Sequence, residues 1–110
     1  MTNEYGERLD RNGYAPSILT GHGPCTCWAC GKNGCMDQLD RHEIFGGPMR
    51  QKSKRLGLWA HLCHSSCHLG GVHCDAELDR ELKQEGQRTA METYGWNVDE
   101  FRRQFGKNYL

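Results

Sequence analysis

The chain lacks three features that would narrow its function directly. It has no excess of charge, because 14 lysines and arginines balance 14 aspartates and glutamates, so it has no global positive field that would attract nucleic acid. It has no apolar run near the roughly 20 residues of a membrane span, and its first residues contain no apolar signal segment. Hydrophobic residues make up only 36% of its 110 residues, so its small core is expected to need extra support.

Cysteine is abundant, by contrast, and its arrangement favours a metal over disulfides. The seven cysteines are an odd number, which argues against a closed disulfide framework. The lack of a signal segment predicts a cytoplasmic, reducing setting, where paired cysteines more often hold a metal. Cys27 and Cys30 have the spacing that grips one tetrahedral ion, and Cys63 and Cys67 can complete the site from one face of a helix start. These four predict a structural Zn²⁺ site, with Cys35 as a spare thiol that can substitute for Cys27 or Cys25.

The pattern along the chain predicts an α+β fold in a single domain. Residues 1–24 mix glycine and charge without a period, which indicates an irregular arm. Residues 36–45 and 56–62 alternate loosely and predict a hairpin of two strands. Residues 75–94 have the composition and the apolar face of a helix, and residues 99–104 predict a short second helix capped by Asn97 or Asp99. We therefore expect an arm (1–24), a zinc-stapled core (25–75) and a C-terminal helical extension (76–110).

The histidines suggest a second metal site, distinct from the cysteines. His42 lies on the first predicted strand with Asp40 and Glu43 close to it, and His68 and His73 follow the second cysteine pair. Imidazoles from a strand and a helix start, beside a zinc anchor, are typical ligands of a divalent cation. The remaining histidines are expected to be exposed or structural: His22, His61 and His64.

One short stretch is strongly basic. It carries four positive charges within six residues and no acid: Arg50, Lys52, Lys54 and Arg55. Because the chain as a whole is neutral, any contact with phosphates has to be local. The stretch fits either a local nucleic-acid contact or a solvated loop.

A cysteine knuckle, a histidine strand bending at glycines and an LC...CH helix start occur here in the order found in HNH nucleases. From about Cys27 to His73 the chain resembles this family, whose ββα-metal core is also called the His-Me finger. The segments HEIFGG, KSKRLGLW, LC...CH...GVH and FGKNYL resemble small HNH proteins of phages and prophages over roughly residues 25–110. The resemblance implies a treble-clef-like ββα-metal core and a cytoplasmic protein of a bacterial or phage-infected cell.

The resemblance also implies hydrolysis of DNA phosphodiester bonds with one divalent ion, Mg²⁺, Mn²⁺ or another. His68 matches the family's metal ligand, and His73 is a further ligand. The strand of the family usually reads as a ligand followed at once by the base histidine, whereas this chain has His42 and Glu43. Either His42 is a ligand and Glu43 the base, which the alignment slightly favours, or His42 is the base and Asp40 supplies the ligand.

Two further points follow from the comparison with the family pattern. The middle asparagine of HNH, which generally braces the loop, has no secure counterpart, since Ser53 or Lys54 falls nearest its place. The departure at Glu43 and the zero net charge leave a second hypothesis, a non-catalytic zinc-binding module that contacts nucleic acid or a protein. Both hypotheses predict a structural zinc, and neither requires a small-molecule cofactor or a membrane.

Overall fold

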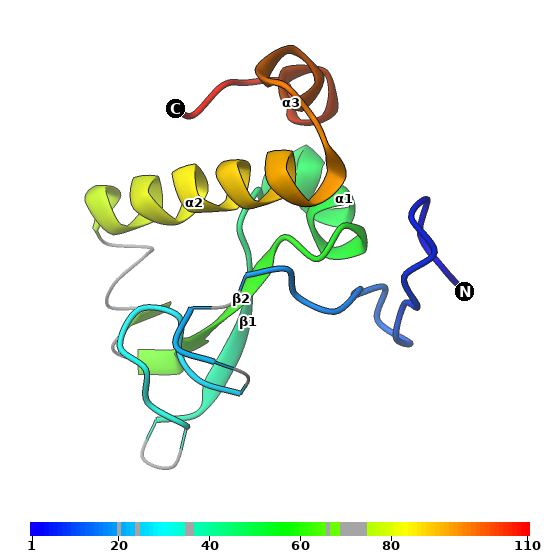
Figure 1. Cartoon of the computed structure of the whole chain (residues 1–110). Coiled ribbons are helices and arrows are strands. Elements are labelled where there is room, and N and C mark those ends of the chain that lie inside the picture. The colour runs from blue at the N-terminus through cyan, green and yellow to red at the C-terminus, as the bar shows by residue number, and fades with distance from the viewer. Residues whose placement is uncertain (20, 24, 35–36, 66, 69–74) are drawn as a thin grey trace.

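In the part of the chain that the structure describes, the regular elements are a two-stranded antiparallel sheet, three α-helices and a 3₁₀ turn. The computed structural model describes residues 1–19, 21–23, 25–34, 37–65, 67–68 and 75–110. The elements in chain order are β1 (Leu39–Glu43), the 3₁₀ turn η1 (Gly47–Met49), α1 (Arg50–Arg55), β2 (Trp59–Cys63), α2 (Ala76–Tyr94) and α3 (Val98–Phe105). The predicted α+β class is thereby confirmed. Helix α2 lies across one end of the hairpin, and α3 lies on the far side of α2 (Figure 1).

The hairpin pairs Leu39 with Cys63 at one end and Glu43 with Trp59 at the other. Both strands are shorter than the predicted ranges 36–45 and 56–62. One position beyond the strands, the Ile44 amide still donates to the Leu58 carbonyl at 3.1 Å. The Ile44 side chain, however, is buried and belongs to the core. The strands end where apolar side chains turn from the sheet into the interior.

The segment between the strands is helical. One interpretation of its basic residues had been a solvated loop. Pro48 lies in the first turn of η1, which passes directly into helix α1. Proline is favoured at the first helical positions, and arginine, glutamine and lysine are good helix formers. Gly57 ends the segment with φ at +72°, a left-handed backbone that glycine adopts without strain. The helix propensities of these residues therefore favour a short helix, although the segment has no hydrophobic periodicity that would predict one.

Helix α2 confirms the helix predicted over residues 75–94. Asp75 caps it, because its side chain accepts hydrogen bonds from two amides of the first turn, and Gly95 ends it in the left-handed region with φ at +70°. Gly86 is buried on the face toward the hairpin. A Cβ atom at this position would lie 3.2 Å from two side-chain carbons of Ile44. The glycine thus lets helix and hairpin approach closely.

Helix α3 and the C-terminal residues complete the core. The Asn97 side chain caps α3 by accepting from the Glu100 amide at 2.8 Å, which selects Asn97 rather than Asp99. Phe101 and Phe105 are buried, as the sequence predicts, and their rings contact the ring of Phe45 at centroid distances of 5.4 and 4.8 Å. The residues after Phe105 pack against this cluster, and Tyr109 is among them.

The N-terminal arm is irregular but tied to the rest of the chain. The Asn3 side chain donates to the Arg55 carbonyl at 2.8 Å, at the end of α1. Along the outer edge of β2, the Ile18 amide donates to the Gly57 carbonyl at 3.0 Å and the Trp28 amide to the His61 carbonyl at 2.8 Å. The arm and the residues near Trp28 thus cover backbone groups that an edge strand would otherwise expose. No helix in the described part of the chain is long and apolar enough to cross a membrane.

Candidate functional site

Four cysteine sulfurs form one group at the end of the hairpin. Cys27, Cys30, Cys63 and Cys67 place their sulfurs within 4.8 Å of one another, and the sulfurs of Cys30 and Cys63 are 3.5 Å apart. A disulfide would bring two sulfurs to about 2.05 Å. Ligands about 2.3 Å from a tetrahedral zinc lie about 3.8 Å from one another. The four predicted cysteines therefore form a group that could hold one metal ion, consistent with structural zinc.

Backbone hydrogen bonds shape the knuckle that carries the first pair. The Gly31 amide donates to the Cys27 carbonyl at 2.9 Å, and the Cys27 amide donates to the Lys32 carbonyl at 2.8 Å. Gly31 has φ at +79°, which explains the glycine directly after Cys30. The Cys63 amide donates to the Cys27 sulfur at 3.4 Å. This last bond orients the Cys27 sulfur through a backbone amide, as is common around protein metal sites.

Burial and neighbouring groups shift the pKa values of three of the four thiols. Burial opposes ionisation of Cys27, but amides of Cys30, Cys63 and Ala29 outweigh it and lower the pKa to about 7. Burial raises the pKa of Cys63 to about 12 and of Cys67 to about 11, with hydrogen bonds and charge from the neighbouring sulfurs adding to it. Without a cation the thiolates disfavour one another, whereas a divalent ion stabilises all of them together.

A second cluster lies on one face of β1 and gathers several of the predicted histidines. Alternation places Asp40 and His42 on the same face of the strand. One oxygen of Asp40 lies 2.9 Å from Nδ1 of His68 and 2.6 Å from Nδ1 of His64. The rings of His42 and His68 are 5.1 Å apart between centroids. The structure thus brings His42 and His68 together, whereas His73 lies outside the described residues.

The Asp40 contact has a chemical consequence for His68. Burial tends to raise the Asp40 pKa, but hydrogen bonds from His68 and His64 outweigh it, so the pKa is lowered and the carboxylate is ionised at neutral pH. With Nδ1 of His68 as the donor to this carboxylate, Nε2 carries the lone pair. A carboxylate that orients a histidine in this way is the usual support of a metal-binding imidazole. Among the described residues, however, only the four cysteines already lie close enough to share one ion.

Glu43 is held in different surroundings. It follows His42 directly, so its side chain points to the opposite face of β1. Its carboxylate accepts from the Tyr14 hydroxyl at 2.8 Å and from Arg50 Nε at 3.0 Å, and only 12% of the side chain is exposed. Burial acts to raise its pKa, but the bonds from Tyr14 and Arg50 outweigh burial, and the pKa is lowered. The structure does not bring Glu43 to the histidine cluster.

The basic residues predicted to contact DNA all lie on α1. Each contacts another part of this chain: Arg50 with Glu43, Lys52 with the Gln104 carbonyl, Lys54 with the Tyr14 ring and Arg55 with Glu4. The side chains of Arg50 and Arg55 are still 59% and 41% exposed. The four basic residues thus lie on one helix, and each has a partner within the chain.

Ser53 has a structural role that the sequence did not reveal. It is fully buried, and its hydroxyl accepts from the Phe45 amide at 3.3 Å and donates to the Leu58 carbonyl. It therefore ties the residues after β1 to those before β2. Nothing in its neighbourhood of lysines and arginines signals a buried residue. Only its nearness to the place of the HNH asparagine pointed to it.

Comparison of the chain with protein-family models, with curated proteins and with solved structures finds no match. The function of the chain therefore has to be inferred from the chemistry of its own residues. The chain is an α+β protein with a four-cysteine group suited to a metal ion. Directly beside that group in the sequence, His64 and His68 meet a carboxylate from β1.

Proposed function

We propose that the chain is a metal-dependent DNA endonuclease of the HNH type, with a treble-clef-like ββα-metal core stapled by zinc. The observation that carries the proposal is the meeting of His42 and His68. These residues come from β1 and from the turn after β2, and their rings lie 5.1 Å apart beside the Asp40 carboxylate. An imidazole oriented by a carboxylate is a suitable ligand for a divalent ion, and a second imidazole beside it can act as a base.

In this proposal His68 is a metal ligand through Nε2, Asp40 orients His68, and His42 removes a proton from the attacking water. This assignment follows from the faces of β1, since His42 shares a face with Asp40 while Glu43 is engaged by Tyr14 and Arg50. A bound Mg²⁺ or Mn²⁺ would neutralise charge on the scissile phosphate and the leaving oxygen. In this assignment Glu43 has a structural role and takes no part in proton transfer.

The bonds of Ser53 support the same reading. In HNH proteins the middle asparagine generally braces the loop between the strands, and here the buried Ser53 hydroxyl links the Phe45 amide to the Leu58 carbonyl. A braced loop holds His42 near the end of β1 in a fixed position. Fixed positions are what a proton-transfer group needs, since small displacements lower rates strongly.

Plasmid nicking by the zinc-loaded chain tests the proposal. We expect nicking of supercoiled DNA with Mg²⁺ or Mn²⁺, and a loss of about a hundredfold or more in His42→Ala and His68→Ala. His22→Ala is the matched control, because His22 is an exposed loop histidine. Metal analysis should find unchanged zinc in all three variants. Cleavage by purified His68→Ala at the wild-type rate would refute the site.

Glu43→Gln separates the two assignments of the base. Glutamine keeps the shape of the side chain and an acceptor for the Tyr14 hydroxyl but cannot take a proton at neutral pH. We expect nicking activity within a few-fold of wild type, measured beside His42→Ala. Activity lost in Glu43→Gln and retained in His42→Ala would show instead that Glu43 is the base.

The contacts of the basic residues favour one alternative, a non-catalytic zinc module. All four basic side chains of α1 already contact other groups of this chain, and the net charge is zero. Such a module would bind DNA or a protein without cleaving any DNA. A chain that retards DNA in gels but leaves linear, supercoiled and branched forms intact with every divalent ion tested would support this alternative.

A further inference from the structure

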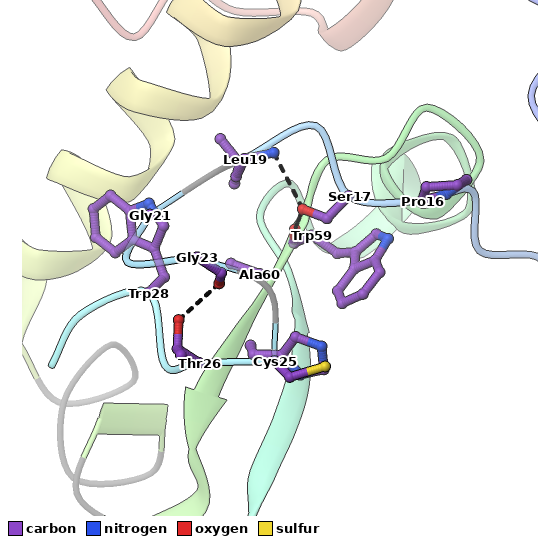
Figure 2. Close-up of a pocket in the computed structure, with 11 residues that line it drawn as sticks. Pro16, Ser17, Leu19, Gly21, Gly23, Cys25, Thr26, Trp28, Trp59 and Ala60 are labelled. Carbon is purple, nitrogen blue, oxygen red and sulfur yellow. Dashed lines mark hydrogen bonds between the residues drawn. The ribbon is translucent and has the colours of Figure 1, made fainter. Parts of the chain in front are cut away.

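A cavity of about 530 Å³ lies on the outer side of β2, and the proposed function makes no use of it. Its walls come from the arm, from the knuckle segment and from the first residues of β2, as Figure 2 shows for Leu19, Trp28 and Trp59. Volumes of 300 to 1,000 Å³ are typical of small-molecule sites. The cavity is thus large enough for a ligand of the size of a nucleoside.

The described lining residues carry no formal charge. They are mostly apolar or aromatic, with two hydroxyl side chains, Ser17 and Thr26. Both hydroxyls already donate within the protein, Ser17 to the Trp59 carbonyl at 2.6 Å and Thr26 to the Gly23 carbonyl at 2.7 Å. The Trp59 indole likewise donates to the Ala15 carbonyl at 2.7 Å. The walls are therefore fixed by internal bonds, and the cavity suits an uncharged, largely flat group.

His61 supplies the polar group that remains for a ligand. Its ring packs edge-on against Trp59 with centroids 5.1 Å apart, and its Nδ1 is enclosed without a hydrogen-bond partner among the described residues. His61 lines the cavity beside Trp59 and Ala60, so its ring is within reach of a ligand there.

A groove that carries two arginines and one aspartate, Asp10, adjoins the cavity. It shares Pro16 and Trp59 with the cavity and adds Arg8 and Arg41. The Arg41 guanidinium lies over the Trp59 ring at 5.1 Å and pairs with Asp10 at 2.8 Å. A ligand with a neutral ring in the cavity and a phosphate at the groove would match both parts.

We propose that this cavity binds a nucleobase, stacked against tryptophan and hydrogen-bonded to His61, with the attached phosphate toward Arg8 and Arg41. Bases have flat faces that stack on aromatic side chains, and their edges carry both donors and acceptors. A neutral imidazole can meet either kind of edge. The inference extends the proposed function, because the base would belong to the DNA strand held on this side of the hairpin.

Fluorescence titration of the zinc-loaded full chain with dAMP and dGMP, without divalent metal, tests the cavity directly. Trp28 and Trp59 line it, so we expect saturable quenching by nucleotides and none by deoxyribose 5-phosphate. His61→Phe keeps the ring shape and should weaken binding about five- to tenfold, the loss expected for one hydrogen bond. Trp28→Leu should weaken binding about tenfold or more.

Controls keep the outcome decisive. Trp28→Phe keeps an aromatic face in case Trp28→Leu fails to fold, and it should bind better than a folded Trp28→Leu. Arg103→Ala on α3 should bind as wild type does. Absence of saturable quenching at millimolar nucleotide, equal quenching by the sugar phosphate, or wild-type affinity in both His61→Phe and Trp28→Phe would overturn the inference.

The two proposals fail separately in these experiments. A chain that nicks plasmid but binds no nucleotide in this assay keeps the proposed function and loses the nucleobase cavity. A chain that binds nucleotides with the predicted variant pattern but never cleaves DNA keeps the cavity and loses the nuclease site.

Discussion

Replacing Cys30 by serine is the sharpest test of the metal centre. Cys30 is exposed, whereas Cys27 and Cys63 are fully buried, so Cys30→Ser leaves no cavity in the core. Any large loss of stability then comes from the metal. Structural zinc contributes about 10–16 kcal/mol of apparent binding free energy in small domains. If one of four ligands carries about a quarter of this, the loss is about 2.5–4 kcal/mol.

That loss is large for a chain of this size. Small domains have free energies of unfolding of about 5–15 kcal/mol, and 1 kcal/mol shifts the melting temperature of such a domain by about 4–8 °C. We therefore expect Cys30→Ser to melt at least about 10 °C below wild type and to retain less than one zinc per chain. Thermal unfolding followed by circular dichroism, with metal analysis of the same samples, measures both.

Cys25→Ser is the matched control, because Cys25 is an exposed cysteine two positions before Cys27 and lies outside the four-sulfur group. It should melt within a degree or two of wild type and keep its zinc. A chelator should lower the melting temperature of wild type and Cys25→Ser and have little further effect on Cys30→Ser. A zinc-free Cys30→Ser that melts with wild type would refute the reasoning.

Three further predictions concern the architecture around the site. Gly57→Ala should lower the free energy of unfolding by about 2–4 kcal/mol in urea titrations, because φ is +72° and the new Cβ would collide with the Pro16 carbonyl; wild-type stability would contradict this. Gly86→Ala should not raise the melting temperature despite its helix gain of about 1 kcal/mol, since its Cβ would press on Ile44 at 3.2 Å. The lowered Glu43 pKa means that its contribution is present at neutral pH and is lost as pH falls below the ordinary value of 4.5 and through the folded-state pKa. Acid titration of stability should therefore show a smaller loss in Glu43→Gln than in wild type, and identical pH profiles would count against this contribution.

Local rules predicted the parts of the fold that depend on neighbouring residues. The caps of α2 and α3 follow from Asp75 and Asn97, and the cysteine spacing predicted a group whose two halves meet only in three dimensions. Helix α1 was missed as a helix because its residues are polar on most sides and only Pro48 marks its start.

The arrangement of the candidate site could be predicted from the sequence only in part. Alternation alone separates His42 from Glu43, but it does not say which face meets His68. That depends on how the chain after β2 turns back to Asp40, a contact between residues 28 positions apart. The cavity beside β2 depends in the same way on the arm, whose residues have no periodic pattern. Tertiary contacts of this kind leave no signature in a single sequence.

The covering of β2 also governs how copies of the chain meet one another. The outward carbonyls of Gly57 and His61 are occupied by amides of Ile18 and Trp28 from the same molecule. A neighbouring copy therefore finds no row of vacant acceptors there on which to extend the hairpin into a longer intermolecular sheet. On the β2 side, segments of the same molecule thus occupy positions that the next strand of a larger sheet would take.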